Sequence, residues 1–263
     1  MHNKSVVDIV EMKKLNKKIV ALTCYDYCFA KIIGSTDIDM ILIGDSLGMV
    51  IQGHETTLPV TLEEIIYHTK CVQRANPTCL LVADLPFLSY QSSTEEAIRS
   101  SGRILKETRA QAVKLEGSKP EIIEAIVNAG IPVMGHLGLT PQSINIFGSY
   151  ATRGKQKQEA DKILSDAKSI EEAGCFSIVL EKIPSALSSE ITDSLNIPTI
   201  GIGAGVHCDG QILVLNDMLG MNSDFKPKFV KFYAELEKTI KDAVNEYCSE
   251  VRKTEFPKQE NSY

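Results

Sequence analysis

Residues 40–47 read MILIGDSL, a short apolar run that ends in polar residues. The same pattern recurs in seven more stretches: IVALTCYD at 19–26, LLVADLPF at 80–87, AVKLEG at 112–117, VMGHLGL at 133–139, FSIVLEKI at 176–183, PTIGIGAG at 198–205 and QILVLND at 211–217. Nearly continuous apolar runs, without alternation of apolar and polar residues, are typical of parallel strands covered on both faces. The sequence therefore predicts eight parallel strands.

Helical patterns separate the predicted strands. Three helices are expected to begin with a capping box, in which a Ser or Thr precedes a Glu by three residues: Thr61 with Glu64, Ser93 with Glu96, and Ser118 with Glu121. Strands that alternate with helices in this way predict an α/β fold, a (β/α)8 TIM barrel. We expect one barrel domain over residues 1–263, with a short N-terminal helix and a C-terminal helix over 228–252.

The interval between the last two predicted strands fits this barrel poorly. Residues 205–210 are too few for a crossover helix between two parallel strands. Either that helix is absent, or the eighth strand lies elsewhere in the sequence.

Composition and charge argue against several classes of partner. The chain has 263 residues and a net charge of −6, and no cluster of Lys and Arg stands out. Nucleic acids and anionic membrane surfaces attract proteins through positive charge, so neither is an expected partner. No apolar run is long enough for a signal peptide or a membrane span. The seven cysteines are scattered without CxxC pairs, which favours reduced thiols and a cytoplasmic protein.

In a (β/α)8 barrel the catalytic groups lie at the C-terminal ends of the strands. Acidic residues and one histidine stand at these ends: Asp26, Asp45, Asp84, Glu116, His136 and Glu181. Lys114 precedes Glu116 by two residues, so both side chains are expected on the same inward face. Six strands thus direct acids, a histidine and a lysine to one mouth of the barrel, where we predict the active site.

Carboxylates that are brought close together raise one another's pKa and attract a cation. Because no Cys or paired His accompanies them, the expected cation is hard, with Mg²⁺ first and Mn²⁺ as an alternative. A 2-oxo acid that chelates such an ion loses the proton next to its ketone more easily, because the metal stabilises the enolate. Glu181, the last acid in the series, is a candidate base. These residues predict metal-assisted enolate chemistry without a particular substrate.

Less specific interpretations of the same residues stay open. Asp45 and Asp84 are alternatively structural acids that bind backbone N–H groups. Lys114 has a second available role, the neutralisation of a neighbouring acid, and Glu181 is alternatively part of a solvated rim. A histidine in an apolar run, such as His136, is often a hydrogen-bonded core residue.

Seven segments match a known family in its own order across nearly the whole chain: TCYDYCFAKI at 23–32, IGDSLGMVIQGHETTLPVT at 43–61, ADLPFLSY at 83–90, VKLEG at 113–117, GHLGLTPQSINIFG at 135–148, GIGAG at 201–205 and DGQILVLNDMLG at 209–220. GDSLGM followed by GHETTLPVT is the most specific part. With these segments the sequence resembles the ketopantoate hydroxymethyltransferase family. The stretch GSYATRGKQ at 148–156 diverges more and is expected to form a lid or a folate contact.

The resemblance implies a (β/α)8 barrel of the phosphoenolpyruvate/pyruvate type, and it implies roles for the residues at the strand ends. These roles are Mg²⁺ binding by Asp45, Asp84 and Glu116; binding of the 2-oxo acid by Asp45, Ser46, Asp84 and Lys114; and proton abstraction by Glu181. His136 falls in the same mouth, and we expect it to contact the substrate or relay a proton.

The reaction that the resemblance implies joins 3-methyl-2-oxobutanoate, 5,10-methylenetetrahydrofolate and water to give 2-dehydropantoate and tetrahydrofolate, a step of pantothenate biosynthesis. Mg²⁺ acidifies C3, Glu181 takes its proton, and the enolate attacks the methylene carbon of the folate. Members that resemble this chain assemble as decamers, so a homodecamer is expected.

Three other functions are compatible with the same residues. One is a Mg²⁺-dependent 2-oxo-acid lyase or mutase, and another is a Schiff-base aldolase with Lys114 as the nucleophile. The third is a non-catalytic barrel that binds a 2-oxo acid, although a degraded site would be expected to have lost one of its charged residues. The glycines of GIGAG at 201–205 either cradle a phosphate or permit tight packing.

Overall fold

The computed structural model describes residues 3–222 and 227–263. Eight parallel strands form a closed barrel in the order of the sequence, and β8 pairs with β1 to close it. The strands are β1 (Ile19–Thr23), β2 (Met40–Ile43), β3 (Leu80–Asp84), β4 (Ala112–Lys114), β5 (Val133–Gly138), β6 (Ser177–Glu181), β7 (Thr199–Ile202) and β8 (Gly210–Leu213). Each strand overlaps one of the eight apolar runs, so the predicted (β/α)8 TIM barrel is confirmed.

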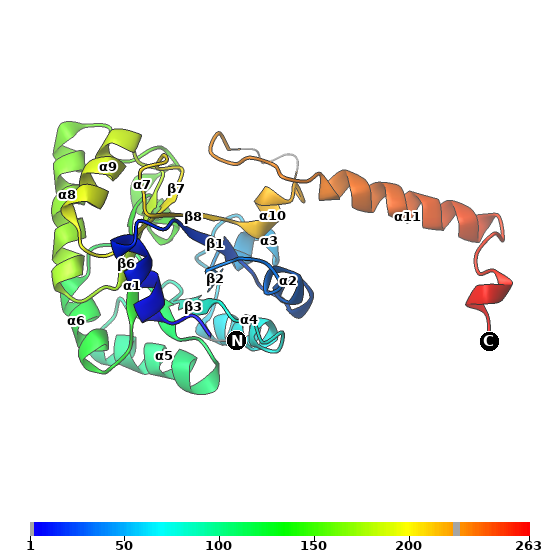
Figure 1. Cartoon of the computed structure of the whole chain (residues 1–263), viewed down its shortest axis with the longest axis horizontal. Helices are drawn as coiled ribbons and strands as arrows, with labels where there is room; N and C mark the ends of the chain where they lie inside the picture. The colour runs from blue at the N-terminus through cyan, green and yellow to red at the C-terminus, as the bar shows by residue number, and fades with distance from the viewer. Residues whose placement is uncertain (1–2, 223–226) are drawn as a thin grey trace. The chain divides into compact units, whose positions relative to one another are not determined.

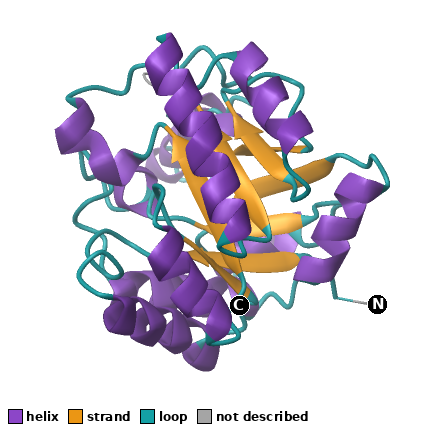
Figure 2. Ribbon diagram, turned by 90° about the vertical axis from the view of Figure 1, so that its left-hand side faces the viewer, coloured by secondary structure: helices purple, strands orange, loops and turns teal. Residues whose placement is uncertain are grey.

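Within residues 1–214, helices surround the strands, as Figure 2 shows in purple and orange. Those before β6 are α1 (Val6–Lys14), α2 (Tyr27–Ile33), α3 (Leu47–Val50), α4 (Leu62–Gln73), α5 (Thr94–Glu107), α6 (Pro120–Asn128), the 3₁₀ helix η1 (Pro141–Ser143), α7 (Ile144–Phe147) and α8 (Lys157–Glu172). After β6 the chain forms α9 (Ser185–Ser194) and, beyond residue 214, α10 (Leu215–Met218), α11 (Leu236–Arg252) and the 3₁₀ helix η2 (Gln259–Asn261).

The chain separates into two compact units, Met1–Val214 and Leu215–Tyr263. All eight strands belong to the first unit, and α10, α11 and η2 belong to the second; their labels are in Figure 1. The expectation of a single domain over residues 1–263 stays a prediction.

Two apolar layers hold the barrel together. Inside it, side chains such as Met40, Val82 and Met134 form one buried cluster, which includes Ile9 of α1. A larger cluster lies between the outer faces of the strands and the helices, with Ile104 of α5 and Ile170 of α8 fully buried. Burial on both faces explains why the strands appear in the sequence as continuous apolar runs.

No helix connects β7 to β8. Residues 203–209, all of which the structure describes, form bends and coil, so the crossover helix is absent and the eighth strand lies where it was predicted. Close packing accompanies the short connection: Gly205 has φ +88°, and a Cβ added there would collide with the hydroxyl of Ser185. Tight packing is therefore the better interpretation of these glycines.

The start of α6 differs from the sequence prediction. The Thr61–Glu64 capping box is present and Ser93 accepts a hydrogen bond from the Glu96 N–H, but Ser118 caps no helix. Helix α6 begins at Pro120, whose fixed φ and missing N–H suit the first helical position.

The C-terminal helix begins at Leu236, eight residues after the predicted position 228. The backbone just before it is engaged elsewhere: Tyr233 and Leu236 donate their N–H groups to the carbonyls of Met218 and Leu219. These hydrogen bonds replace the ones that a continuous helix would make. Across the described ranges, no helix combines the length and the apolar character that crossing a bilayer requires.

Candidate active site

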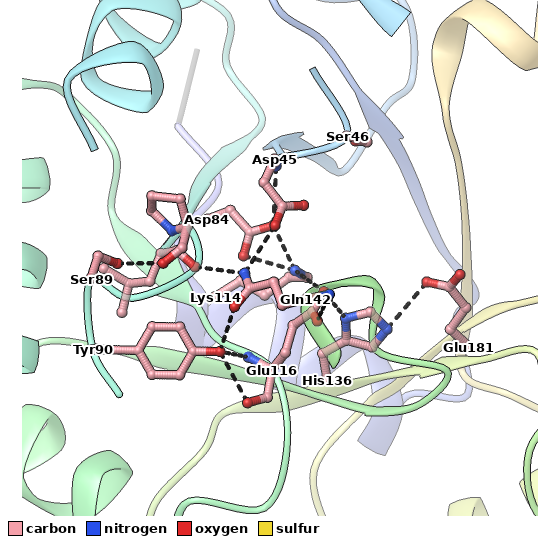
Figure 3. A network of polar contacts seen from close by, with 12 residues as sticks. Asp45, Ser46, Asp84, Ser89, Tyr90, Lys114, Glu116, His136, Gln142 and Glu181 are labelled. Atoms are coloured by element: carbon pink, nitrogen blue, oxygen red, sulfur yellow. Dashed lines mark hydrogen bonds and ion pairs between the residues drawn. The ribbon is translucent and has the colours of Figure 1, made fainter. Parts of the chain in front are cut away.

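The two-residue period of a strand carries four polar side chains to one mouth of the barrel. In each case an apolar residue fills the barrel interior, and a polar residue follows two positions later on the same face: Val82 and Asp84, Ala112 and Lys114, Met134 and His136, Val179 and Glu181. Asp45 and Ser46 come from the turn after β2, and Glu116 from the turn after β4. The structure therefore brings together all seven predicted site residues (Figure 3).

Lys114 and Asp84 form a buried ion pair. The ammonium lies 2.7 and 2.8 Å from the two carboxylate oxygens of Asp84 and 3.9 Å from Glu116 Oε1. Burial alone would lower the pKa of Lys114, but Asp84 and Glu116 outweigh it and raise that pKa above its usual value. A Schiff-base nucleophile must be a neutral amine, so this environment disfavours the aldolase interpretation of Lys114.

Asp45 and Asp84 place two carboxylates side by side. The backbone N–H of Asp45 donates to Asp84 Oδ2 at 3.3 Å, and a Cβ added at Gly44 would lie 3.7 Å from the same oxygen. Burial, Asp84 and Glu116 raise the pKa of Asp45 well above its usual range. Burial also raises the pKa of Asp84, although the Lys114 ammonium opposes this shift. A cation at this position would relieve the repulsion between the acids.

The carboxylate oxygens of this cluster suit a hard cation that takes only some of its ligands from the protein. Mg²⁺ is typically held by one or two carboxylates and completes its shell with water or substrate oxygens. Asp45 and Asp84 supply two such carboxylates. In the part of the chain that the structure describes, no group of three His, Cys, Asp or Glu residues forms a metal-binding cluster. The pair therefore suits an open Mg²⁺ site, and it does not suit a closed site such as structural zinc.

Glu116 faces a histidine. His136 Nδ1 lies 3.2 Å from Glu116 Oε1, and His136 Nε2 lies 3.2 Å from Glu181 Oε2, so the ring bridges two carboxylates (Figure 3). Burial opposes the charged imidazole, but Glu116 and Glu181 outweigh it and raise the pKa of His136 to about 9. The two carboxylates therefore favour the charged form of the ring. Direct ligation of a metal by Glu116 stays a prediction.

Glu181 lies nearer to solvent than the residues below it. Its side chain is 17% exposed, whereas the His136 side chain beneath it is 3% exposed. The predicted lid loop at 148–156 lies close by, because Lys182 Nζ donates to the carbonyl of Tyr150. Burial, Glu181 and Asp45 together raise the pKa of Tyr150. A general base at the rim of the mouth can contact a substrate that enters from solvent.

Two further residues of the site were not predicted from the sequence. Gln142 of η1 is buried and donates its side-chain N–H groups to Asp45 and to the Leu85 carbonyl, at 2.9 Å each. The buried Tyr90 hydroxyl accepts a hydrogen bond from the Glu116 N–H at 3.0 Å. Neither residue belongs to a strand, since Tyr90 lies in a loop and Gln142 in a 3₁₀ helix, and only their presence in the matching segments 83–90 and 135–148 pointed to them.

Ser46 and Asp26 have different surroundings. The Ser46 hydroxyl lies 2.7 Å from the Tyr25 hydroxyl, at the edge of the acidic cluster. Asp26 instead caps α2 by accepting a hydrogen bond from the Phe29 N–H at 2.9 Å. This explains Asp26 as a structural strand-end acid, in agreement with its omission from the predicted metal ligands.

The chain matches the family described as ketopantoate hydroxymethyltransferase over residues 3–259. It belongs to that family. A relative from Caldicellulosiruptor saccharolyticus, named 3-methyl-2-oxobutanoate hydroxymethyltransferase, is 52% identical over 265 aligned residues that cover all of both chains. A relative of the same name from Clostridium botulinum is 54% identical over 255 residues, covering 96% of this chain and 93% of the other.

Solved structures with the same barrel are more distant. A phosphonopyruvate hydrolase solved with oxalate and Mg²⁺ aligns over 98% of this chain and 93% of its own, with a TM-score of 0.64 and 10% identity. A 2,3-dimethylmalate lyase, titled a member of the PEP mutase/isocitrate lyase superfamily, covers 82% of each chain with a TM-score of 0.59 and 14% identity. These likenesses show that this ketopantoate hydroxymethyltransferase family member shares its barrel fold with them.

Proposed function

We propose that this protein transfers a hydroxymethyl group to 3-methyl-2-oxobutanoate and forms 2-dehydropantoate, a step of pantothenate biosynthesis. The one-carbon donor in this proposal is 5,10-methylenetetrahydrofolate. Membership of the family and the names of its relatives support the reaction. The observation that carries it to this chain is the buried mouth in which Asp84, Lys114, His136 and Glu181 converge.

Asp45 and Asp84 would hold Mg²⁺, and Glu116 would assist through a water molecule. When bound, the ion supplies Lewis-acid polarisation of the ketone, which makes the C3 proton of the keto acid easier to remove. The two-carboxylate donor set and the repulsion between Asp45 and Asp84 support this assignment. Mn²⁺ is the expected substitute, because it accepts the same oxygen ligands.

The other side chains bind the keto acid and move its proton. Lys114, held as an ammonium, attracts the substrate carboxylate, and the Ser46 hydroxyl offers a hydrogen bond to it. Glu181 accepts the proton from C3, and C3 then forms a bond to the methylene carbon of the folate as one of its two carbon–nitrogen bonds breaks. Water replaces the second nitrogen, so the product gains the hydroxyl and tetrahydrofolate leaves with the proton. His136, whose Nε2 lies 3.2 Å from Glu181 Oε2, holds that carboxylate in place at the mouth.

Deuterium exchange at C3 of 3-methyl-2-oxobutanoate tests this proposal without the folate. Wild-type protein should exchange the proton in the presence of Mg²⁺ and stop when EDTA removes the ion. Glu181→Gln should still bind the keto acid and Mg²⁺ but exchange at least about 100-fold more slowly, the usual range for a general base. Exchange that is indifferent to Mg²⁺ would refute the metal role, and normal exchange by the variant would remove Glu181 as the base.

The folate-dependent step separates this reaction from its nearest rival. A 2-oxo-acid lyase or mutase would share the Mg²⁺-dependent exchange but would not consume a folate. We expect 2-dehydropantoate to form only when 5,10-methylenetetrahydrofolate is added. A product that forms without the folate would select the rival.

We also propose that the protein works as a homo-oligomer, a homodecamer by resemblance to the family. Helix α11 supports this proposal with an apolar stripe at helical spacing: Ile240, Val244, Tyr247 and Val251 are 44–55% exposed. Such a stripe is typical of a helix that packs against another surface.

The seven free cysteines support a reducing compartment, and we place the protein in the cytoplasm.

A further inference from the structure

Gln142 lies at the centre of the carboxylate cluster, and both polar atoms of its side chain have two partners. Nε2 donates to Asp45 Oδ2 and to the Leu85 carbonyl, at 2.9 Å each. Oε1 accepts from Gln91 Nε2 at 3.0 Å and from the Tyr90 hydroxyl at 2.8 Å. The residue is 5% exposed, so water cannot replace these contacts easily.

The contacts of Nε2 determine which way this amide points. The Leu85 carbonyl can only accept a hydrogen bond and the Gln91 amide nitrogen can only donate one, so a reversed amide would set oxygen against oxygen and nitrogen against nitrogen. The nitrogen is therefore fixed toward Asp45. The backbone N–H of Gln142 donates at the same time to Glu116 Oε2 at 2.9 Å. One residue of η1 thus contacts carboxylates that follow β2 and β4.

We propose that Gln142 is a positioning residue, which holds Asp45 in the orientation that binds Mg²⁺ and aligns Glu116 beside it. This inference rests on the proposed function, because that function makes Asp45 a metal ligand. When one oxygen of a carboxylate is held by a hydrogen bond, the other oxygen keeps a fixed direction. The side chain then loses less conformational entropy when a cation binds. Such supporting contacts typically change metal affinity by about 10-fold to 100-fold.

Gln142→Met tests the proposal, because methionine keeps the length of the side chain and removes its hydrogen bonds. Gln111→Met is the matched control. Gln111 also bridges two segments, accepting from the Leu81 N–H at 3.1 Å and donating to the Lys4 carbonyl at 2.9 Å, but it lies before β4 at the opposite end of the barrel. The measurement is Mn²⁺ affinity by electron paramagnetic resonance, in the presence of 3-methyl-2-oxobutanoate and without folate.

Gln142→Met should bind Mn²⁺ at least about 10-fold more weakly than wild type, and Gln111→Met within twofold of it. Because the defect lies in metal affinity, excess Mn²⁺ should restore C3 exchange in Gln142→Met. Equal affinity in Gln142→Met and wild type would overturn the proposal, as would exchange that excess Mn²⁺ fails to restore. Wild-type protein that binds no Mn²⁺ would refute the proposed function and this inference together.

Tyr90→Phe provides a second variant if Gln142→Met does not fold. It retains the ring and removes the hydroxyl, so the Gln142 amide loses one of the contacts that orient it and the Glu116 N–H loses its acceptor. We expect a loss of Mn²⁺ affinity in the same direction but smaller than for Gln142→Met. An affinity equal to that of wild type would overturn the positioning role.

Discussion

At the scale of single residues, the charges of the site depend on one another. The side chains of Lys114 and Asp84 are 4% and 1% exposed, and a buried charge without its partner is strongly destabilising. Asp84→Ala should therefore lower the free energy of unfolding by about 3 kcal/mol, measured by urea denaturation. Asp166→Ala is the control: it breaks the exposed Lys162–Asp166 pair of α8 and should cost less than about 0.5 kcal/mol. Equal losses in the two variants would contradict the expectation.

The cysteines provide a prediction about pH. Cys24 is buried and Cys28, four residues later, is exposed; burial raises the pKa of Cys24 to about 11. The thiolate is the reactive form, so a raised pKa keeps Cys24 protonated and unreactive throughout the range from pH 7 to 9. In native protein at pH 8, a thiol reagent should modify Cys28 and leave Cys24 intact, as peptide mass spectrometry would detect. Similar modification of both residues would contradict this environment.

Strand periodicity accounts for the site residues that could be predicted. Asp84, Lys114 and Glu181 are the last residues of β3, β4 and β6, and a residue at the end of a strand in this barrel can only face the mouth or the helices. Tyr90 comes from a loop and Gln142 from the single-turn helix η1, and neither segment is long enough for a period that would predict the direction of a side chain. Their roles depend on the folded path of the chain, and the sequence alone could not indicate them.

At the scale of secondary structure elements, the end of β5 depends on a glycine. Gly138 has φ +91°, and a Cβ there would collide with the carbonyl of Glu181 and lie 2.7 Å from Ile183 Cγ2. Gly130 has a similar φ of +85° and open space around it. Gly130→Ala should therefore cost only the backbone strain, about 1–2 kcal/mol, as measured by urea denaturation. Gly138→Ala should lower the free energy of unfolding by more than this. It should also slow C3 exchange, because it displaces β6 at Glu181, the proposed general base.

Contradiction would take the form of equal unfolding free energies for the two alanine variants, together with unchanged C3 exchange in Gly138→Ala. That result would mean that the end of β6 can move without affecting Glu181.

The elements themselves were predicted unequally. All eight strands were found because burial on two faces leaves a compositional mark on each of them. The start of α6 was placed wrongly at Ser118, because a proline at the first helical position served in place of a capping box. The start of α11 was placed wrongly at 228, because backbone hydrogen bonds to residues 218–220 compete with the helix there. A helical pattern in the local sequence cannot predict such hydrogen bonds to a distant segment.

At the scale of the whole molecule, α11 is the element that the proposed assembly needs. Its stripe contains Ile240 and Val244, 48% and 53% exposed. Ile240→Glu with Val244→Glu should shift the protein to smaller species in sedimentation velocity, because burying two carboxylates in an apolar contact is unfavourable. Lys238→Glu, about 160° around the helix from Ile240, should leave the species unchanged. An unaltered sedimentation coefficient in the double variant would exclude this stripe from the contact.

The difference in depth between Glu181 and the residues below it has a consequence for timing. Asp84 and Lys114 are almost inaccessible, and Glu181 stands above them at the rim. Under the proposed function, the small keto acid has to pass the rim before the bulky pterin covers it. Steady-state kinetics should therefore follow an ordered sequential scheme, with the keto acid as the leading substrate and tetrahydrofolate released before 2-dehydropantoate. Product-inhibition patterns typical of random addition would mean that a second route leads to the bottom of the barrel.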